Sequence, residues 1–71
     1  MMFKVRARSI IKDGKNQARI SWMKLDKDYY VQDVMKYRDR DSKEIITLFL
    51  IGDPDTGNLI WVNWAGVSYV E

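Results

Sequence analysis

The chain has 71 residues, a net charge of +2, 46% hydrophobic residues and neither cysteine nor histidine. A chain of this length buries only about 60% of its unfolded surface, so we expect one small domain spanning residues 1–71. The absence of cysteine and histidine excludes disulfides, the common zinc sites and the two side chains most used in catalysis near neutral pH. We therefore expect a non-catalytic protein that uses no cofactor and no metal.

The apolar segments are too short to cross a membrane. The longest, residues 45–51, is interrupted by Thr47, whereas a spanning helix needs about 20 apolar residues. Near the N-terminus, basic residues alternate with apolar ones, and the apolar core of a signal peptide does not follow. These features predict no membrane association and a cytoplasmic location.

Charge is distributed unevenly along the chain. Residues 1–25 contain seven basic residues and one acidic residue, whereas residues 26–71 contain five basic residues and nine acidic ones. This asymmetry predicts a molecule with a basic end that can meet a polyanion.

The first predicted element is a β-hairpin. Residues 3–11 alternate apolar and basic side chains, which is the pattern of a half-buried strand, and residues 17–24 alternate again. Between them, Asp13-Gly14 favours a two-residue type I′ turn. The register that follows places the pairs 5–22, 7–20, 9–18 and 11–16 on a mainly apolar face. The opposite face carries the pairs 4–23, 6–21, 8–19 and 10–17.

Residues 29–38 fit two kinds of secondary structure. A short helix would place Tyr30, Val34 and Tyr37 on one face, with Asp28 as its N-cap. Tyrosine and valine suit a pleated surface, so we predict a strand and keep the helix as the alternative.

The C-terminal half predicts a second hairpin. Residues 44–51 are β-branched and apolar on both sides, a turn-rich segment follows at residues 52–58, and residues 59–64 return as the partner strand. With Gly52 opposite Asn58, one face is expected to be core. Its members are Ile46, Leu48, Leu50, Ile60, Val62 and Trp64.

These elements together predict an all-β fold. Gly66 marks a bulge or bend before a short final segment, residues 67–70. The result is about five short antiparallel strands in sequential order. A twisted meander of this size closes most readily into a small barrel, SH3-like or OB-like, because closure covers the sheet edges.

Two pairs of aspartates resemble metal ligands. Asp39 and Asp41 form one pair, and Asp53 and Asp55 form the other. Both pairs fall in predicted turns, where aspartate accepts hydrogen bonds from nearby backbone amides, and the second pair lacks the remaining ligands of a calcium loop. The sequence therefore predicts no metal site.

The first candidate binding surface is the basic face of the first hairpin. Arginine and lysine suit phosphate oxygens, and bases spaced two residues apart on a strand can follow a nucleic acid, single-stranded or in transient contact with a duplex. The alternative is a solvated face whose charges are neutralised by carboxylates of the same chain. The candidate residues are Lys4, Arg6, Arg8, Lys12, Lys15 and Arg19.

The second candidate surface is the other face of the second hairpin. There the predicted register makes Phe49 and Trp61 a cross-strand aromatic pair, which stacks on bases or anchors a protein partner unless the fold buries it. Nucleic-acid binding is the leading hypothesis. The alternative is a protein-binding adaptor or inhibitor, of a size typical of phage or mobile-element proteins, or a homodimer.

Overall fold

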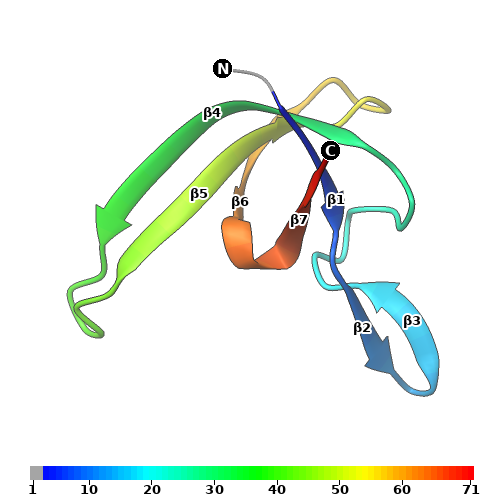
Figure 1. Ribbon diagram of the computed structural model, residues 1–71, viewed down its shortest axis with the longest axis horizontal. Coiled ribbons are helices and arrows are strands. Elements are labelled where there is room, and N and C mark those ends of the chain that lie inside the picture. Colours follow the sequence, from blue (N-terminus) through cyan, green and yellow to red (C-terminus); the bar gives the residue numbers. More distant parts are fainter. Residues whose placement is uncertain (1–2) are drawn as a thin grey trace.

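The computed structural model describes residues 3–71, which form seven strands and one short 3-10 helix. The elements are β1 (Phe3–Ala7), β2 (Ser9–Lys12), β3 (Lys15–Ala18), β4 (Tyr29–Arg38), β5 (Ile45–Gly52), β6 (Leu59–Asn63), η1 (Trp64–Gly66) and β7 (Val67–Val70). The all-β prediction is confirmed, and residues 29–38 form a strand (Figure 1). In the described part of the chain, no helix is long and apolar enough to cross a membrane.

Five strands form one antiparallel sheet in the order β6-β5-β4-β1-β7, and β2 with β3 forms a separate two-stranded ribbon. β6 and β7 are the two edges of the large sheet, yet only η1 connects them. The sheet must therefore curl until its edges approach each other, as Figure 1 shows. Among residues 3–71 no ladder joins β6 to β7, so the predicted closure into a barrel is not found.

The first hairpin matches the prediction only in its outer half. The ladder from Ser9↔Ala18 to Lys12↔Lys15 has the predicted register. Asp13 and Gly14 take φ angles of 54° and 75°, which a type I′ turn requires. The remaining pairs, between residues 4–7 and 20–23, were predicted wrongly.

β1 takes different partners because a two-stranded ribbon is marginal and leaves one backbone edge of each strand unpaired. β1 lies between β4 and β7, where both of its edges form ladders. In this position Val5 is only 1% exposed. A strand paired with residues 20–23 alone would bury far less of it.

The second hairpin forms with its register shifted by one residue. Gly52 pairs with Leu59, where the prediction placed Asn58. The turn has its own hydrogen bonds: the Asp53 N–H donates to the Asn58 carbonyl at 2.8 Å, and the Gly57 N–H donates to the Asp53 carbonyl at 2.7 Å. These bonds keep Asn58 in the loop and start the ladder one residue later.

Because side chains alternate along a strand, a shift of one residue moves each β5 side chain to the face opposite the predicted one, relative to β6. Ile51, which is 0% exposed, and Val62 share the core face with half-buried Phe49. Leu48 and Leu50, which were predicted in the core, lie on the outer face. The predicted core set is therefore divided between the two sides of the sheet.

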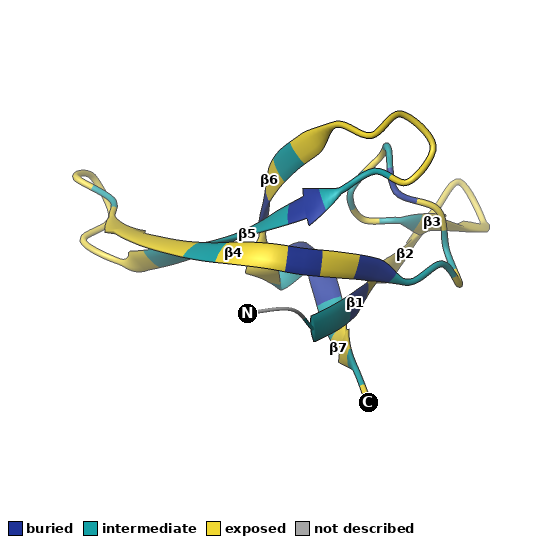
Figure 2. Ribbon diagram, turned by 90° about the horizontal axis from the view of Figure 1, so that it is seen from above, coloured by how far each residue is buried: buried dark blue, intermediate teal, exposed yellow. Residues whose placement is uncertain are grey.

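The core lies on the concave side of the curled sheet. Its buried members are Val5, Met23, Tyr29, Val31, Ile51, Val62 and Val67. A β-bulge interrupts the β4–β5 ladder between Val31 and Asp33. Beyond the bulge, β4 and β5 extend away from the core as a long hairpin with mostly exposed residues on β4 (Figure 2).

Candidate nucleic-acid interface

The β2–β3 ribbon projects from the main sheet, and nearly all of its residues are exposed. Even Ile11 is 78% exposed. Hydrogen bonds at its base fix its direction: the Arg19 N–H donates to the Arg8 carbonyl at 2.7 Å, and the Arg8 N–H donates to the Gly66 carbonyl at 2.9 Å. Asp13-Gly14 closes the other end. The ribbon is therefore held at both ends while its faces stay in water.

One face of this ribbon is basic. Strand alternation and the observed register place Arg8 and Arg19 at its base and Lys12 opposite Lys15 at its tip. All four are exposed, and among residues 3–71 none of them forms a salt bridge. The Arg8 Nε donates to the Val67 carbonyl at 3.0 Å, which leaves the terminal nitrogens of its guanidinium available. We call Arg8, Lys12, Lys15 and Arg19 the ribbon cations.

The other two predicted basic residues lie on β1 and share one carboxylate partner, Asp28. The Arg6 Nε donates to Asp28 Oδ1 at 2.6 Å, and the Lys4 Nζ lies 3.9 Å from Asp28 Oδ2. The hydrogen bond from Arg6 lowers the pKa of the Asp28 carboxyl and raises the pKa of the guanidinium. Asp28 offsets one of the two positive charges, so for Lys4 and Arg6 the alternative of neutralisation by a carboxylate of the same chain applies in part.

A second ion-pair cluster was not foreseen from the sequence. Asp55, in the loop after β5, lies 3.2 Å from the Lys24 Nζ and 3.1 Å from the Lys27 Nζ. The hydrogen bond from Lys27 is the main cause of the lowered pKa of Asp55. Both lysines precede β4, far from Asp55 in sequence, so no local pattern could reveal the contact. Two aspartates thus engage four cations, none of which lies on the ribbon.

The turn interpretation of the paired aspartates agrees with the contacts. Asp53 Oδ1 accepts the Asp55 N–H at 2.9 Å, and Asp39 Oδ1 accepts the Asp41 N–H at 3.2 Å. Over residues 3–71, no group of three or more histidine, cysteine or acidic side chains could hold a metal ion.

The predicted aromatic pair does not form. With the shifted register, Phe49 lies opposite Val62 on the core face, where its ring packs edge-to-face on Phe3 with centroids 5.4 Å apart. Trp61 lies opposite Leu50 on the outer face and is 40% exposed. Phe49 is therefore removed from the candidate contact surface, and Trp61 remains.

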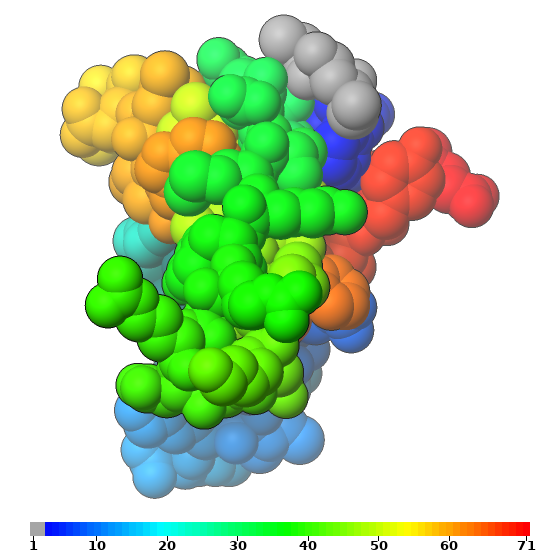
Figure 3. All heavy atoms as spheres, turned by 90° about the vertical axis from the view of Figure 1, so that its left-hand side faces the viewer, coloured from blue at the N-terminus to red at the C-terminus, as the bar shows by residue number. Residues whose placement is uncertain are grey.

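Trp61 belongs to an apolar outer face that the predicted register had hidden. The ladders align Trp61 with Leu50 and align Met35 with Leu48 on the same side of the sheet. Figure 3 views the side of the molecule where β4, with parts of β5 and β6, forms the surface. The members of this outer face are Met35, Tyr37, Ile46, Leu48, Leu50, Leu59 and Trp61.

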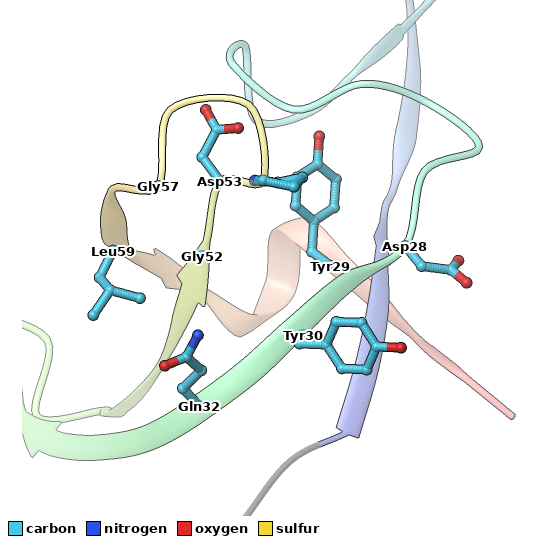
Figure 4. Close-up of a pocket in the computed structure, with 9 residues that line it drawn as sticks. Asp28, Tyr29, Tyr30, Gln32, Gly52, Asp53, Gly57 and Leu59 are labelled. Carbon is cyan, nitrogen blue, oxygen red and sulfur yellow. The ribbon is translucent and has the colours of Figure 1, made fainter.

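A hollow of about 310 Å³ lies between the start of β4 and the loop after β5 (Figure 4). Its lining includes Tyr29, Tyr30 and Leu59, with the carboxylates of Asp28 and Asp53. The Tyr29 hydroxyl accepts the Lys24 N–H at 2.9 Å. Within residues 3–71 no buried side-chain polar atom lacks a hydrogen-bond partner. The lining contains no lysine or arginine, so the hollow does not extend the basic surface.

Comparisons with protein-family models, with curated proteins and with solved structures give no match.

Proposed function

We propose that the chain is a non-catalytic nucleic-acid-binding protein whose β2–β3 ribbon contacts phosphates. The observation that carries the proposal is that the four ribbon cations are exposed at the base and the tip of one ribbon and have no carboxylate partner among residues 3–71. Lys12 stands directly opposite Lys15, and like charges in such a pair cost roughly 0.2 to 1 kcal/mol. An anionic ligand would remove that repulsion.

The shape of the ribbon suits this ligand. Its two strands lie about 4.8 Å apart, and the major groove of a duplex, about 12 Å wide, admits a two-stranded ribbon. The same face can also follow the backbone of a single strand. With only four cations on the ribbon, binding should be weak and strongly dependent on salt. If each contacts one phosphate, log affinity should fall against log salt with a slope of about −3.6 for a duplex or about −2.8 for a single strand.

The experiment is a fluorescence anisotropy titration with single- and double-stranded DNA and RNA between 50 and 200 mM salt, a range chosen from the known salt response of such complexes. The test variant is Lys12→Gln/Lys15→Gln, which neutralises the tip of the ribbon. The control is Lys36→Gln/Lys43→Gln, which makes the same change in net charge at two exposed cations away from the ribbon.

The tip variant should halve the salt slope, and the control should leave it close to that of the wild type. Equal effects of the two variants would show that only net charge matters. Binding that does not respond to salt, or no binding at low salt, would contradict the proposal directly.

We also propose that the fold is an SH3-like barrel left open between β6 and β7. The strand order and the short η1 connection between the two edge strands support this assignment. Such small barrels present their ligand surfaces on loops and hairpins, which is where the ribbon lies.

Protein binding is the second candidate function. It is favoured by the outer face, where Met35 and Trp61 are each 40% exposed beside half-buried Leu48 and Leu50. A contiguous apolar surface rimmed by polar residues is typical of a protein interface. On this hypothesis Trp61→Ala would abolish capture of a partner, while Lys12→Gln/Lys15→Gln would leave it intact.

A further inference from the structure

β6 is an edge strand with its outer backbone groups free. The bond from the Asp53 N–H to the Asn58 carbonyl flanks the Gly52↔Leu59 pair, which identifies it as a non-hydrogen-bonded pair of the ladder. Every second residue of β6 follows the same pattern. Leu59, Trp61 and Asn63 therefore direct their backbone N–H and carbonyl groups away from β5. Of these six groups, the Asn63 carbonyl lies at the N-cap of η1, where it accepts the first hydrogen bond of that helix. Outside η1 and the ladder, no hydrogen bond within residues 3–71 uses the other five groups.

This edge carries none of the usual protection against pairing. β6 has the sequence Leu-Ile-Trp-Val-Asn, with no charge and no proline, and its ladder with β5 has no bulge. Two of the side chains at the edge, Leu59 and Trp61, are 53% and 40% exposed. Figure 2 shows β6 at the border of the sheet, with no further strand beside it.

The other edge of the sheet differs. The Arg8 N–H bonds to the Gly66 carbonyl, so the ladder pattern turns the Val67 carbonyl outward on β7. The Arg8 Nε donates to that carbonyl at 3.0 Å. A side chain of the same molecule thus covers part of the β7 edge. No comparable contact covers β6 in the described residues.

We propose that β6 pairs antiparallel with β6 of a second copy of this chain, about a two-fold axis at Trp61. The outward residues 59, 61 and 63 are symmetric about Trp61 when the strand faces its own reversed copy. The Trp61 N–H and carbonyl then meet those of Trp61 in the second copy, and the Asn63 N–H meets the Leu59 carbonyl of that copy. Trp61 then lies opposite its counterpart, and Leu59 lies opposite Asn63 of the second copy.

The charge of the strand selects this occupant. An edge strand rich in lysine would repel its own copy, whereas two uncharged edge strands have no electrostatic repulsion between them. The pairing also places the two Trp61 side chains side by side and joins the apolar outer faces of the two copies. A stable interface buries about 800 Å² per partner, and this short edge supplies less. The dimer should therefore be weak, with a dissociation constant in the micromolar range.

The first test exploits the backbone of Asn63. Its φ of −69° already matches the value that proline imposes, so Asn63→Pro removes an outward N–H without changing the strand direction. The substitution also removes the side chain that accepts the Ala65 N–H at 2.9 Å. Asn63→Ala removes the same side chain but keeps the N–H, and it is the matched control.

Sedimentation equilibrium without nucleic acid should show a monomer–dimer equilibrium for the wild type and for Asn63→Ala. Asn63→Pro should weaken dimerisation at least tenfold, and circular dichroism would verify that each variant is folded. A wild-type chain that stays monomeric at several hundred micromolar, or equal dimerisation of the two variants, overturns the proposal. Because no nucleic acid is present, this result is independent of the ribbon hypothesis.

A second pair of variants separates edge pairing from stacking of the outer faces. Trp61→Lys and Met35→Lys introduce the same charge on the same face at equally exposed positions, but only Trp61 lies on the edge strand. Edge pairing predicts that Trp61→Lys abolishes the dimer and that Met35→Lys retains it. Equal loss in both variants would assign the contact to the outer face and overturn the edge proposal, even if Asn63→Pro failed to fold.

Discussion

Gly66 lies where the base of the β2–β3 ribbon meets η1, and there is no room for a larger residue. A Cβ atom at this position would lie 2.6 Å from Ile20 Cδ1 and 2.7 Å from Ile20 Cγ1. Carbon atoms in favourable contact are about 3.5 to 4.0 Å apart. In the variant Gly66→Ala, the Ile20 side chain must therefore move by about 1 Å or adopt another rotamer.

The expected cost combines two opposing effects. Overpacking a filled site costs about 1 to 3 kcal/mol, whereas replacing glycine by alanine restricts the unfolded chain and returns about 0.4 to 1 kcal/mol. We expect Gly66→Ala to lower the free energy of unfolding by about 1 to 2 kcal/mol. In a domain of this size that corresponds to a fall in Tm of about 4 to 16 °C.

Urea unfolding followed by circular dichroism measures this change, and a double-mutant cycle identifies its cause. Ile20→Ala removes both atoms that would meet the new Cβ. In that background Gly66→Ala should be neutral or slightly stabilising. If it costs the same free energy with and without the Ile20 side chain, the steric explanation is refuted. Because the Gly66 carbonyl also accepts the Arg8 N–H, faster hydrogen exchange at the Arg8 N–H should accompany the destabilisation.

Three further predictions concern the core and the ion pair on β1. Ile51→Ala should lower the free energy of unfolding by about 2 to 4 kcal/mol in urea titrations, because Ile51 is fully buried. Asp28→Asn should release Arg6 and Lys4 and steepen the salt dependence of DNA binding; an unchanged slope would show that β1 lies outside the contact surface. The hydrogen bond from Arg6 lowers the pKa of Asp28 in the folded chain below its pKa of about 4 in the unfolded chain. The ion pair should therefore stabilise the fold fully at pH values above the unfolded-state pKa, and this stabilisation should be lost as the pH falls through the folded-state pKa. Urea midpoints from pH 6 to pH 2 should show a smaller decline in Asp28→Asn than in the wild type.

Local turn chemistry explains the part of the fold that could be predicted. Asp13-Gly14 specified both the turn type and the register of the ribbon, because positive φ angles at two successive residues are costly for other dipeptides. The tyrosines and valines of residues 29–38 favoured a strand, and the long ladder with β5 supplies the tertiary contacts that exclude a helix.

The predicted strand pairings are wrong where segments distant in sequence compete to pair with the same strand. The alternating pattern of residues 3–11 is the same whether the strand pairs with residues 20–23 or lies between β4 and β7, since pattern shows which side is buried but not which neighbour provides the backbone partners. In the second hairpin, the longer loop around Asp53 has internal hydrogen bonds that no dipeptide preference predicts. A slip of one residue was enough to exchange Phe49 for Leu50 on the exposed side.

For the same reason, the sequence could not show which candidate cations have a carboxylate partner: two of the six, Lys4 and Arg6, pair with Asp28. The sequence shows where cations alternate, whereas neutralisation depends on which loops come close. Asp28 engages Arg6 across 22 residues of sequence, and Asp55 engages Lys27 across 28. Neither contact leaves a local signal.

The projection of the ribbon is what keeps its charge uncompensated. On β1 of the main sheet, Lys4 and Arg6 lie within reach of Asp28 and both form an ion pair with it. The ribbon leaves the sheet after Arg8 and contains a single acidic residue, Asp13, whose backbone is committed to the turn. The change of partner for β1 therefore separates the two groups of cations: those on β1 pair with Asp28, whereas Arg19 and the tip lysines have no carboxylate partner among residues 3–71.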